Sequence, residues 1–107
     1  MLKTARVAVD GALYHFDREY TYLVPESMAS TLRPGCRVRV TFGAGNLRRQ
    51  GMVLQVLEEE LPDSHRVKPI LEQLDETPLL NEEGLMLLRY LKEQTFCTWF
   101  DGVRLLV

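Results

Sequence analysis

The chain has 107 residues, of which 46% are hydrophobic and 26% are charged, and its formal net charge is −2 at pH 7. This is the composition of an ordinary folded domain, and the length suffices for one hydrophobic core but not for two. No apolar run approaches the roughly 18 residues of a membrane span, and residues 1–6 lead into no signal-peptide core. We therefore expect a single cytoplasmic domain, residues 1–107, with no membrane partner.

The small net charge hides an asymmetry along the chain. Residues 1–55 carry eight Lys and Arg against four Asp and Glu, a balance of +4, whereas residues 56–107 carry five against eleven, a balance of −6. The basic half is compatible with a surface that binds nucleic acid, and equally with charges that only solvate the surface. Charge alone leaves both interpretations open.

The first half of the chain is typical of a β-sheet. Strands are expected at residues 5–9, 20–24, 37–42 and 52–57. These stretches either alternate polar and apolar side chains or are rich in aromatic and β-branched residues. Between them, residues 12–19 have no clean period and are expected to form a loop, and residues 25–29 fit a short helical turn.

The predicted hairpin formed by the last two of these strands is the feature around which the chain is organised. Residues 37–42 alternate charged and apolar side chains, so one face can pack, and the strand then breaks at Gly43 and Gly45. A strand that ends in this way can present backbone groups to a ligand. The basic residues of the hairpin are Arg37, Arg39, Arg48 and Arg49. Strand alternation predicts that the first two share one face.

The second half changes from strand to helix. Residues 58–64 are acidic and contain a proline, so they are expected to form an exposed loop. Residues 67–74 are a candidate for a fifth strand at a sheet edge, because Pro69 has no N–H to donate. Asn81 can cap a helix whose first turn carries two glutamates. Residues 95–107 space aromatic and aliphatic side chains three to four apart, which predicts a second helix packed on the first.

The residues give no sign of a catalytic or metal site. His15 and His65 are isolated, and Cys36 and Cys97 lie far apart with no further ligand at metal spacing, so loop histidines and free thiols are expected. Residues 43–45 (GAG) lack the lysine and the helix of a phosphate-binding loop. We expect no catalytic residue, no metal and no cofactor in this domain.

Four motifs follow one another along the chain. They are YTYLVP at residues 20–25, GCRVRVTFG at 35–43, GMV at 51–53 and KPILEQLD at 68–75. In this order and at this spacing they resemble the N-terminal domain of the primosomal protein N′ family, the PriA replication-restart helicases. Each motif alone is unspecific, but the resemblance spans nearly the whole chain.

The resemblance implies a domain that binds the 3′ end of the nascent leading strand at a stalled DNA fork, whatever the terminal base. The family's pocket residues correspond to Tyr20, Thr21, Gly43 and Lys68. An aromatic ring can stack on any base, a glycine permits close backbone approach and a lysine can meet a phosphate. Thr21 replaces an aspartate of the family pattern, so a hydroxyl stands in place of a carboxylate. The four hairpin arginines are expected to hold the flanking phosphates.

The predicted fold is α+β: a strongly twisted, barrel-like antiparallel β-sheet over residues 1–75, followed by a short helical C-terminal segment over 76–107. The apolar end of the chain suggests a fragment of a longer chain, and the resemblance implies that the longer protein is a helicase. The resemblance then implies that ATP and zinc are bound only by the missing parts, and that the partners are DNA, other primosome proteins and the rest of the helicase. The alternative is a small β-barrel module that binds a protein through its acidic helical half and binds no nucleic acid.

Overall fold

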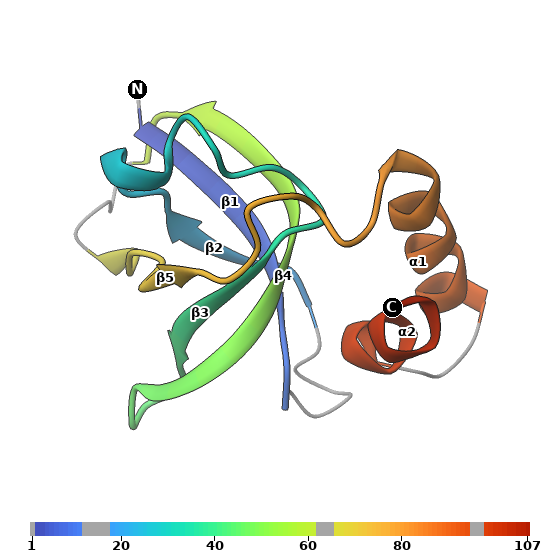
Figure 1. Ribbon diagram of the computed structural model, residues 1–107. Helices are drawn as coiled ribbons and strands as arrows, with labels where there is room; N and C mark the ends of the chain where they lie inside the picture. Colours follow the sequence, from blue (N-terminus) through green and yellow to red (C-terminus); the bar gives the residue numbers. More distant parts are fainter. Residues whose placement is uncertain (1, 12–17, 62–65, 95–97) are drawn as a thin grey trace.

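The computed structural model describes residues 2–11, 18–61, 66–94 and 98–107. These residues form one antiparallel sheet and two C-terminal helices, which confirms the predicted α+β class (Figure 1). The strands are β1 (Leu2–Val9), β2 (Tyr20–Leu23), β3 (Arg37–Phe42), β4 (Leu47–Glu59) and β5 (Glu72–Gln73), and a 3₁₀ turn, η2 (Glu26–Met28), follows β2. The helices are α1 (Glu82–Gln94) and α2 (Trp99–Leu106). The helical turn predicted over 25–29 is thereby confirmed, whereas most of the loop predicted over 12–19 lies outside the described residues.

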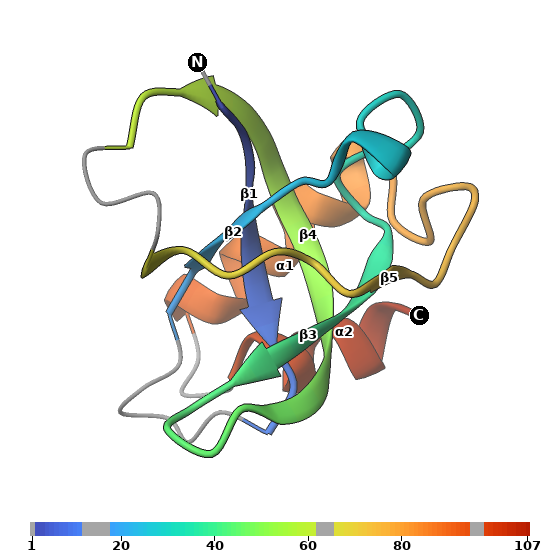
Figure 2. The same ribbon diagram turned by 90° about the vertical axis from the view of Figure 1, so that its left-hand side faces the viewer.

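The long strand β4 organises the sheet, whose order is β2-β1-β4-β3-β5. Its second half pairs with β1 and its first half with β3, and a register shift between Arg6 and Val7 marks a bulge that bends the sheet. The order ends at β2 and β5, so the sheet is not closed and the predicted barrel-like form does not hold for the strand pairing. An irregular segment links the two edges instead (Figure 2): Ile70 N donates to Leu23 O at 3.0 Å and Leu71 N donates to Arg39 O at 2.9 Å.

Two apolar clusters lie on opposite faces of the sheet. The first is made mainly by alternate residues of the strands, together with Leu32 and Ile70, and contains Ala5, Val7, Val9, Tyr22, Val24, Cys36, Val38, Val40 and Val53. The second joins the other face to the helices and contains Ala8, Met52, Leu54, Leu80, Leu88, Trp99, Phe100 and Val103. Both helices cover the same side of the sheet (Figure 1). Among the described residues, the first face is therefore packed by strands, loops and the η2 turn, and not by α1 or α2.

The end of β4 differs from the prediction. The acidic loop expected over 58–64 begins later, because Glu58 and Glu59 still belong to the strand, while residues 62–65 lie outside the described part. The Glu59 carboxylate accepts hydrogen bonds from Thr4 Oγ1 at 2.5 Å and from the Arg6 guanidinium at 2.8 and 3.1 Å. These bonds from Arg6 and Thr4 lower the pKa of Glu59, and the bond to Glu59 raises the pKa of Arg6. An acidic residue that finds cationic and hydroxyl partners on β1 can thus extend the strand.

The fifth strand is shorter than predicted. Of residues 67–74 only Glu72 and Gln73 pair regularly with β3, and Pro69 makes an isolated bridge with Leu23. A proline has no N–H to donate, so the segment cannot form a continuous ladder.

The helices are capped as their sequences suggest. Asn81 Oδ1 accepts from Gly84 N at 2.9 Å at the start of α1, which confirms the predicted cap. Thr98 and Asp101 form a reciprocal capping box at α2, which starts at Trp99 rather than near residue 95. Leu79 N donates to Gly35 O at 2.9 Å and so joins the helical part to the turn before β3. None of the helices in the described ranges is long and apolar enough to cross a membrane.

Candidate nucleic-acid interface

The turn between β3 and β4, residues 43–46, is the centre of the candidate site and is called here the hairpin turn. Gly43 has φ 78° and Asn46 has φ 49°, and Asn46 N donates to Gly43 O at 3.1 Å. Glycine and asparagine are the residues that adopt positive φ most readily. Apart from Gly43 and its two chain neighbours, no described residue has a heavy atom within 4 Å of the point where a Cβ on Gly43 would stand. The turn therefore leaves open space directly beside the Gly43 backbone.

Lys68 reaches this turn from the segment before β5. Its Nζ donates to Asn46 Oδ1, although the two residues are 22 positions apart. Its backbone is fixed at the edge of β2, because Leu23 N donates to Lys68 O at 2.9 Å. The structure thus brings Lys68 and Gly43, two of the predicted pocket residues, to the same turn.

Tyr20 approaches the same end of the sheet from β2. Its ring meets the Phe42 ring edge-on, with centroids 4.9 Å apart and planes at 83°, and Phe42 directly precedes Gly43. The Arg18 guanidinium carbon lies 5.5 Å from the centroid of the Tyr20 ring. Tyr22, two residues on, is buried on the same face and donates from its hydroxyl to Thr41 O at 2.7 Å. Burial, with a smaller contribution from Tyr20, raises the pKa of Tyr22 to about 12.

Thr21 does not join the other predicted pocket residues. In the register of β1 and β2, Thr21 stands opposite Arg6, whereas Tyr20 stands opposite Val7 and Tyr22 opposite Ala5. Residues directly opposite in an antiparallel pair share a face of the sheet. The Thr21 side chain therefore lies on the face opposite to that of Tyr20.

The two arginines of β3 share a face, as predicted, and both are ion-paired. The Arg37 guanidinium donates to Asp75 at 2.9 and 3.0 Å, and Arg37 N donates to the same carboxylate at 2.8 Å. Arg39 Nε lies 3.3 Å from Glu72 Oε1 in a more exposed pair. The hydrogen bonds to Arg37 hold the pKa of Asp75 below its usual value, and the same pairing raises the pKa of Arg37. These four residues, Arg37, Arg39, Glu72 and Asp75, form what we call the paired edge.

The basic residues around the hairpin turn differ from Arg37 and Arg39 in their ion pairing. We call Arg18, Arg48, Arg49 and Lys68 the turn cations; in the described part of the chain none of them has an acidic partner within ion-pair distance. Arg48 is exposed opposite Thr41, on the face of the sheet that carries Arg37 and Arg39, whereas Arg49 stands opposite Val40 on the face of Tyr20. Arg49 is half-buried over Gly11, and its buried Nε has no hydrogen-bond partner among the described residues. Among the residues that the structure describes, no carboxylate therefore compensates the positive charge at this end of the sheet.

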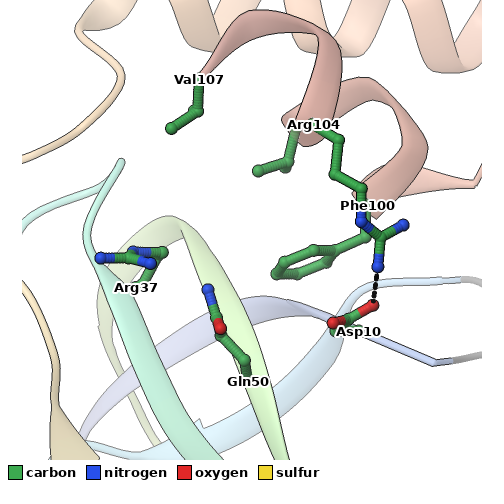
Figure 3. Close-up of a pocket in the computed structure, with 7 residues that line it drawn as sticks. Asp10, Arg37, Gln50, Phe100, Arg104 and Val107 are labelled. Atoms are coloured by element: carbon green, nitrogen blue, oxygen red, sulfur yellow. Dashed lines mark hydrogen bonds and ion pairs between the residues drawn. The ribbon is translucent and has the colours of Figure 1, made fainter.

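A hollow of about 260 Å³ lies between the sheet and α2, on the face of the sheet opposite to that of Tyr20 (Figure 3). It is lined by Asp10, Arg37, Gln50, Phe100, Val103, Arg104 and Val107. Arg104 donates to Asp10 Oδ1 at 2.7 Å, and Arg37 is held by Asp75, so both arginines of the hollow already have carboxylate partners. The described residues also contain no group of three or more His, Cys, Asp or Glu side chains that could hold a metal ion.

Two residues of the site were not predicted from the sequence. Asn46 follows two glycines and is typical of a turn, but nothing in its neighbourhood indicates a bond to Lys68. Arg18 stands two residues before Tyr20, and its position over that ring depends on how the chain enters β2. His15, His65 and Cys97 lie outside the described residues, and Cys36 is a buried free thiol, as expected.

A small α+β domain that gathers an aromatic ring and cations without a described acidic partner around an open glycine turn has the features of a nucleic-acid-binding module. The model of the PriA 3′ DNA-binding domain (3′BD) family matches residues 6–107, so the chain belongs to this family. The chain is also 34% identical over 91 residues to the replication restart protein PriA of Bacillus subtilis (strain 168). That match covers 85% of this chain and 11% of the relative's length.

The predicted resemblance is thereby confirmed. The family is defined by DNA binding and is not a catalytic domain, in line with the expected absence of an enzymatic role for this chain. The match does not support the alternative of an interaction module that binds no nucleic acid.

Proposed function

We propose that this domain holds the 3′ terminus of a DNA strand at the hairpin turn, without selecting the terminal base, and thereby positions a replication-restart helicase at a fork. The observation that carries the proposal is the convergence of Tyr20, Gly43 and Lys68 at one turn, in a chain that belongs to a 3′ DNA-binding family.

Each of these three residues offers a contact of its own. The Tyr20 ring provides a stacking surface that does not distinguish bases, and Arg18 lies over the ring where it can contact the stacked base or the next phosphate. The open space beside Gly43 allows the terminal sugar to approach the backbone closely. Lys68 supplies a positive charge at the same turn. Hydrogen bonds from backbone groups to a free terminal hydroxyl would select a strand end over an internal nucleotide.

The phosphate contacts are best assigned to the turn cations. Arg48 and Arg49 carry charge that no acidic partner in the described ranges neutralises, and binding of phosphate to them releases counterions from the DNA. Arg37 and Arg39 would reach phosphate only after giving up Asp75 and Glu72. Thr21 would take part only through the opposite face of β2, so its hydroxyl is the least well placed of the predicted contacts.

The proposal extends to the longer protein from which such a domain would come. The chain spans about a tenth of the length of the PriA relative it matches. The helicase activity, the binding of ATP and zinc, contacts with other primosome proteins and a cytoplasmic location would then belong to the whole protein.

Fluorescence anisotropy with a short single-stranded oligonucleotide tests the proposal directly. Binding to an oligonucleotide with a free 3′ hydroxyl is compared with binding to the same oligonucleotide carrying a 3′ phosphate. We expect clear preference for the free hydroxyl, no dependence on the terminal base, and affinity that falls steeply with added salt. Equal binding to both oligonucleotides would reduce the site to a general basic surface, and no binding even at low salt would remove the proposal altogether.

A further inference from the structure

Asn46 links the two parts of the chain that build the proposed site. It closes the hairpin turn through its N–H to Gly43 O, and its side-chain oxygen accepts from Lys68 Nζ. Lys68 is itself tied to β2, the strand that carries Tyr20, by the backbone bond from Leu23 N. The Asn46 amide is therefore the point where the hairpin turn meets the β2 side of the site.

The chemistry of this acceptor suits a lysine that must keep its charge. The ammonium group of lysine has three N–H donors, and one of them is used by the Asn46 carbonyl oxygen. An amide oxygen fixes the direction of the ammonium but does not neutralise it, as a carboxylate would. The two remaining donors and the full positive charge stay available for a phosphate. Arg37 differs from Lys68 in this respect, because its charge is already paired with the Asp75 carboxylate.

We propose that Asn46 is a positioning residue: it aims Lys68 at the DNA backbone and leaves its charge free, and so sets how tightly the strand end is held. The inference rests on the proposed function, because it assigns Lys68 a phosphate contact.

A simpler role for Asn46 is that of a turn residue chosen for its positive φ. Glycine satisfies that requirement and removes the acceptor, so Asn46→Gly separates the two roles. Aspartate also tolerates this backbone region and keeps an acceptor, but adds a negative charge, so Asn46→Asp tests the importance of the neutral amide.

The test measures anisotropy with the free 3′-hydroxyl oligonucleotide for the wild-type chain, Asn46→Gly, Asn46→Asp, Lys68→Ala and the double variant Asn46→Gly/Lys68→Ala. We expect Asn46→Gly to weaken binding about threefold to fivefold, because Lys68 loses its orientation. Asn46→Asp should weaken it about tenfold and lower the slope of log affinity against log salt by about one, as if one phosphate contact were lost. In the Lys68→Ala background, Asn46→Gly should have no further effect.

The outcomes separate this inference from the proposed function. If the wild-type chain prefers the free hydroxyl and Lys68→Ala weakens binding, but Asn46→Gly binds like the wild type, the positioning role is wrong and the function stands. The same conclusion follows if Asn46→Gly weakens binding equally in the presence and absence of the lysine, or if Asn46→Asp leaves the salt slope unchanged. If the wild-type chain shows no preference for a strand end, the proposed function fails first. Thermal unfolding of each variant checks that the domain is still folded.

Discussion

The paired edge has two arginines and the hairpin turn is surrounded by the four turn cations, and the two groups differ in their carboxylate partners. At the paired edge, Arg37 and Arg39 hold Asp75 and Glu72, and so fasten the segment around β5 to β3. At the hairpin turn, Arg48 and Arg49 have no acidic partner among the described residues, and the backbone beside Gly43 is open. The difference teaches that the proposed DNA site follows from the distribution of carboxylate partners and not from a count of basic residues.

The largest effect is expected where the turn itself is filled. Gly43→Val places a β-branched side chain at φ 78° and in the space assigned to the terminal sugar. Losing one or two close backbone contacts costs about 2 kcal/mol, so affinity for the free 3′ end should fall about thirtyfold in an anisotropy titration.

The matched control is Gly45→Val in the same turn. Gly45 is not among the glycines with positive φ, and only the Leu47 side chain, at 4.0 Å, lies near the position of its Cβ. This variant should bind nearly as the wild type does. Equal losses for the two valines would mean that the turn as a whole, and not the space at Gly43, governs binding.

A smaller effect is expected when the charges of the two regions are removed in pairs. Arg48→Ala/Arg49→Ala should lower DNA affinity about tenfold near physiological salt and reduce the salt slope by about two, because two phosphate contacts are lost. Arg37→Ala/Arg39→Ala should change affinity less than about twofold, since exchange of an existing ion pair for a phosphate gains little. Salt titrations of both double variants check this prediction. The reverse order would place the DNA along the paired edge.

The smallest effect is expected on stability, when the carboxylates of the paired edge are changed instead of its arginines. Asp75→Asn keeps the shape of the side chain but removes a largely buried carboxylate that accepts three hydrogen bonds from Arg37. The free energy of unfolding should fall by about 1–2 kcal/mol, with DNA affinity unchanged. Urea unfolding measures the loss. Glu72→Gln, which removes the exposed carboxylate of the same edge, should cost less than about 0.5 kcal/mol and serves as the control.

The stability that Asp75 contributes depends on pH in a defined way. The pKa of Asp75 is lower in the folded chain than in the unfolded chain, so the unfolded chain binds more protons in the acid range. The contribution of Asp75 to stability is therefore complete above about pH 4 and is lost as the pH falls below that value. Asp75→Asn should show a shallower loss of stability between about pH 4 and pH 2 than the wild type. Identical acid profiles would show that Asp75 contributes no pH-dependent stability.

Local patterns predicted much of this arrangement. Alternation and the two glycines defined β3 and its turn, and Asn81 with two following glutamates defined the start of α1. Neighbouring residues of a strand point to opposite faces, so alternation alone predicts that Tyr20 and Thr21 lie on different faces of β2.

Contacts between distant residues could not be predicted in this way. The partners of Glu59 are Thr4 and Arg6, the partner of Arg37 is 38 positions away, and Lys68 finds Asn46 22 positions away. No local pattern records which charge meets which, because that depends on the register of strands that pair only in the folded sheet. The length of β4 and the division between free and paired arginines follow from these contacts.

The bond between Leu79 and Gly35 has a mechanical consequence. Gly35 has φ 95°, and a Cβ there would stand 2.0 Å from Leu80 O, so the helical part is pressed directly onto the turn that leads into β3. The opposite end of β3 carries the hairpin turn. A DNA end bound at that turn would exert force on β3. The other end of β3 is hydrogen-bonded to the segment before α1, so the force would be transmitted along β3 to the helical part.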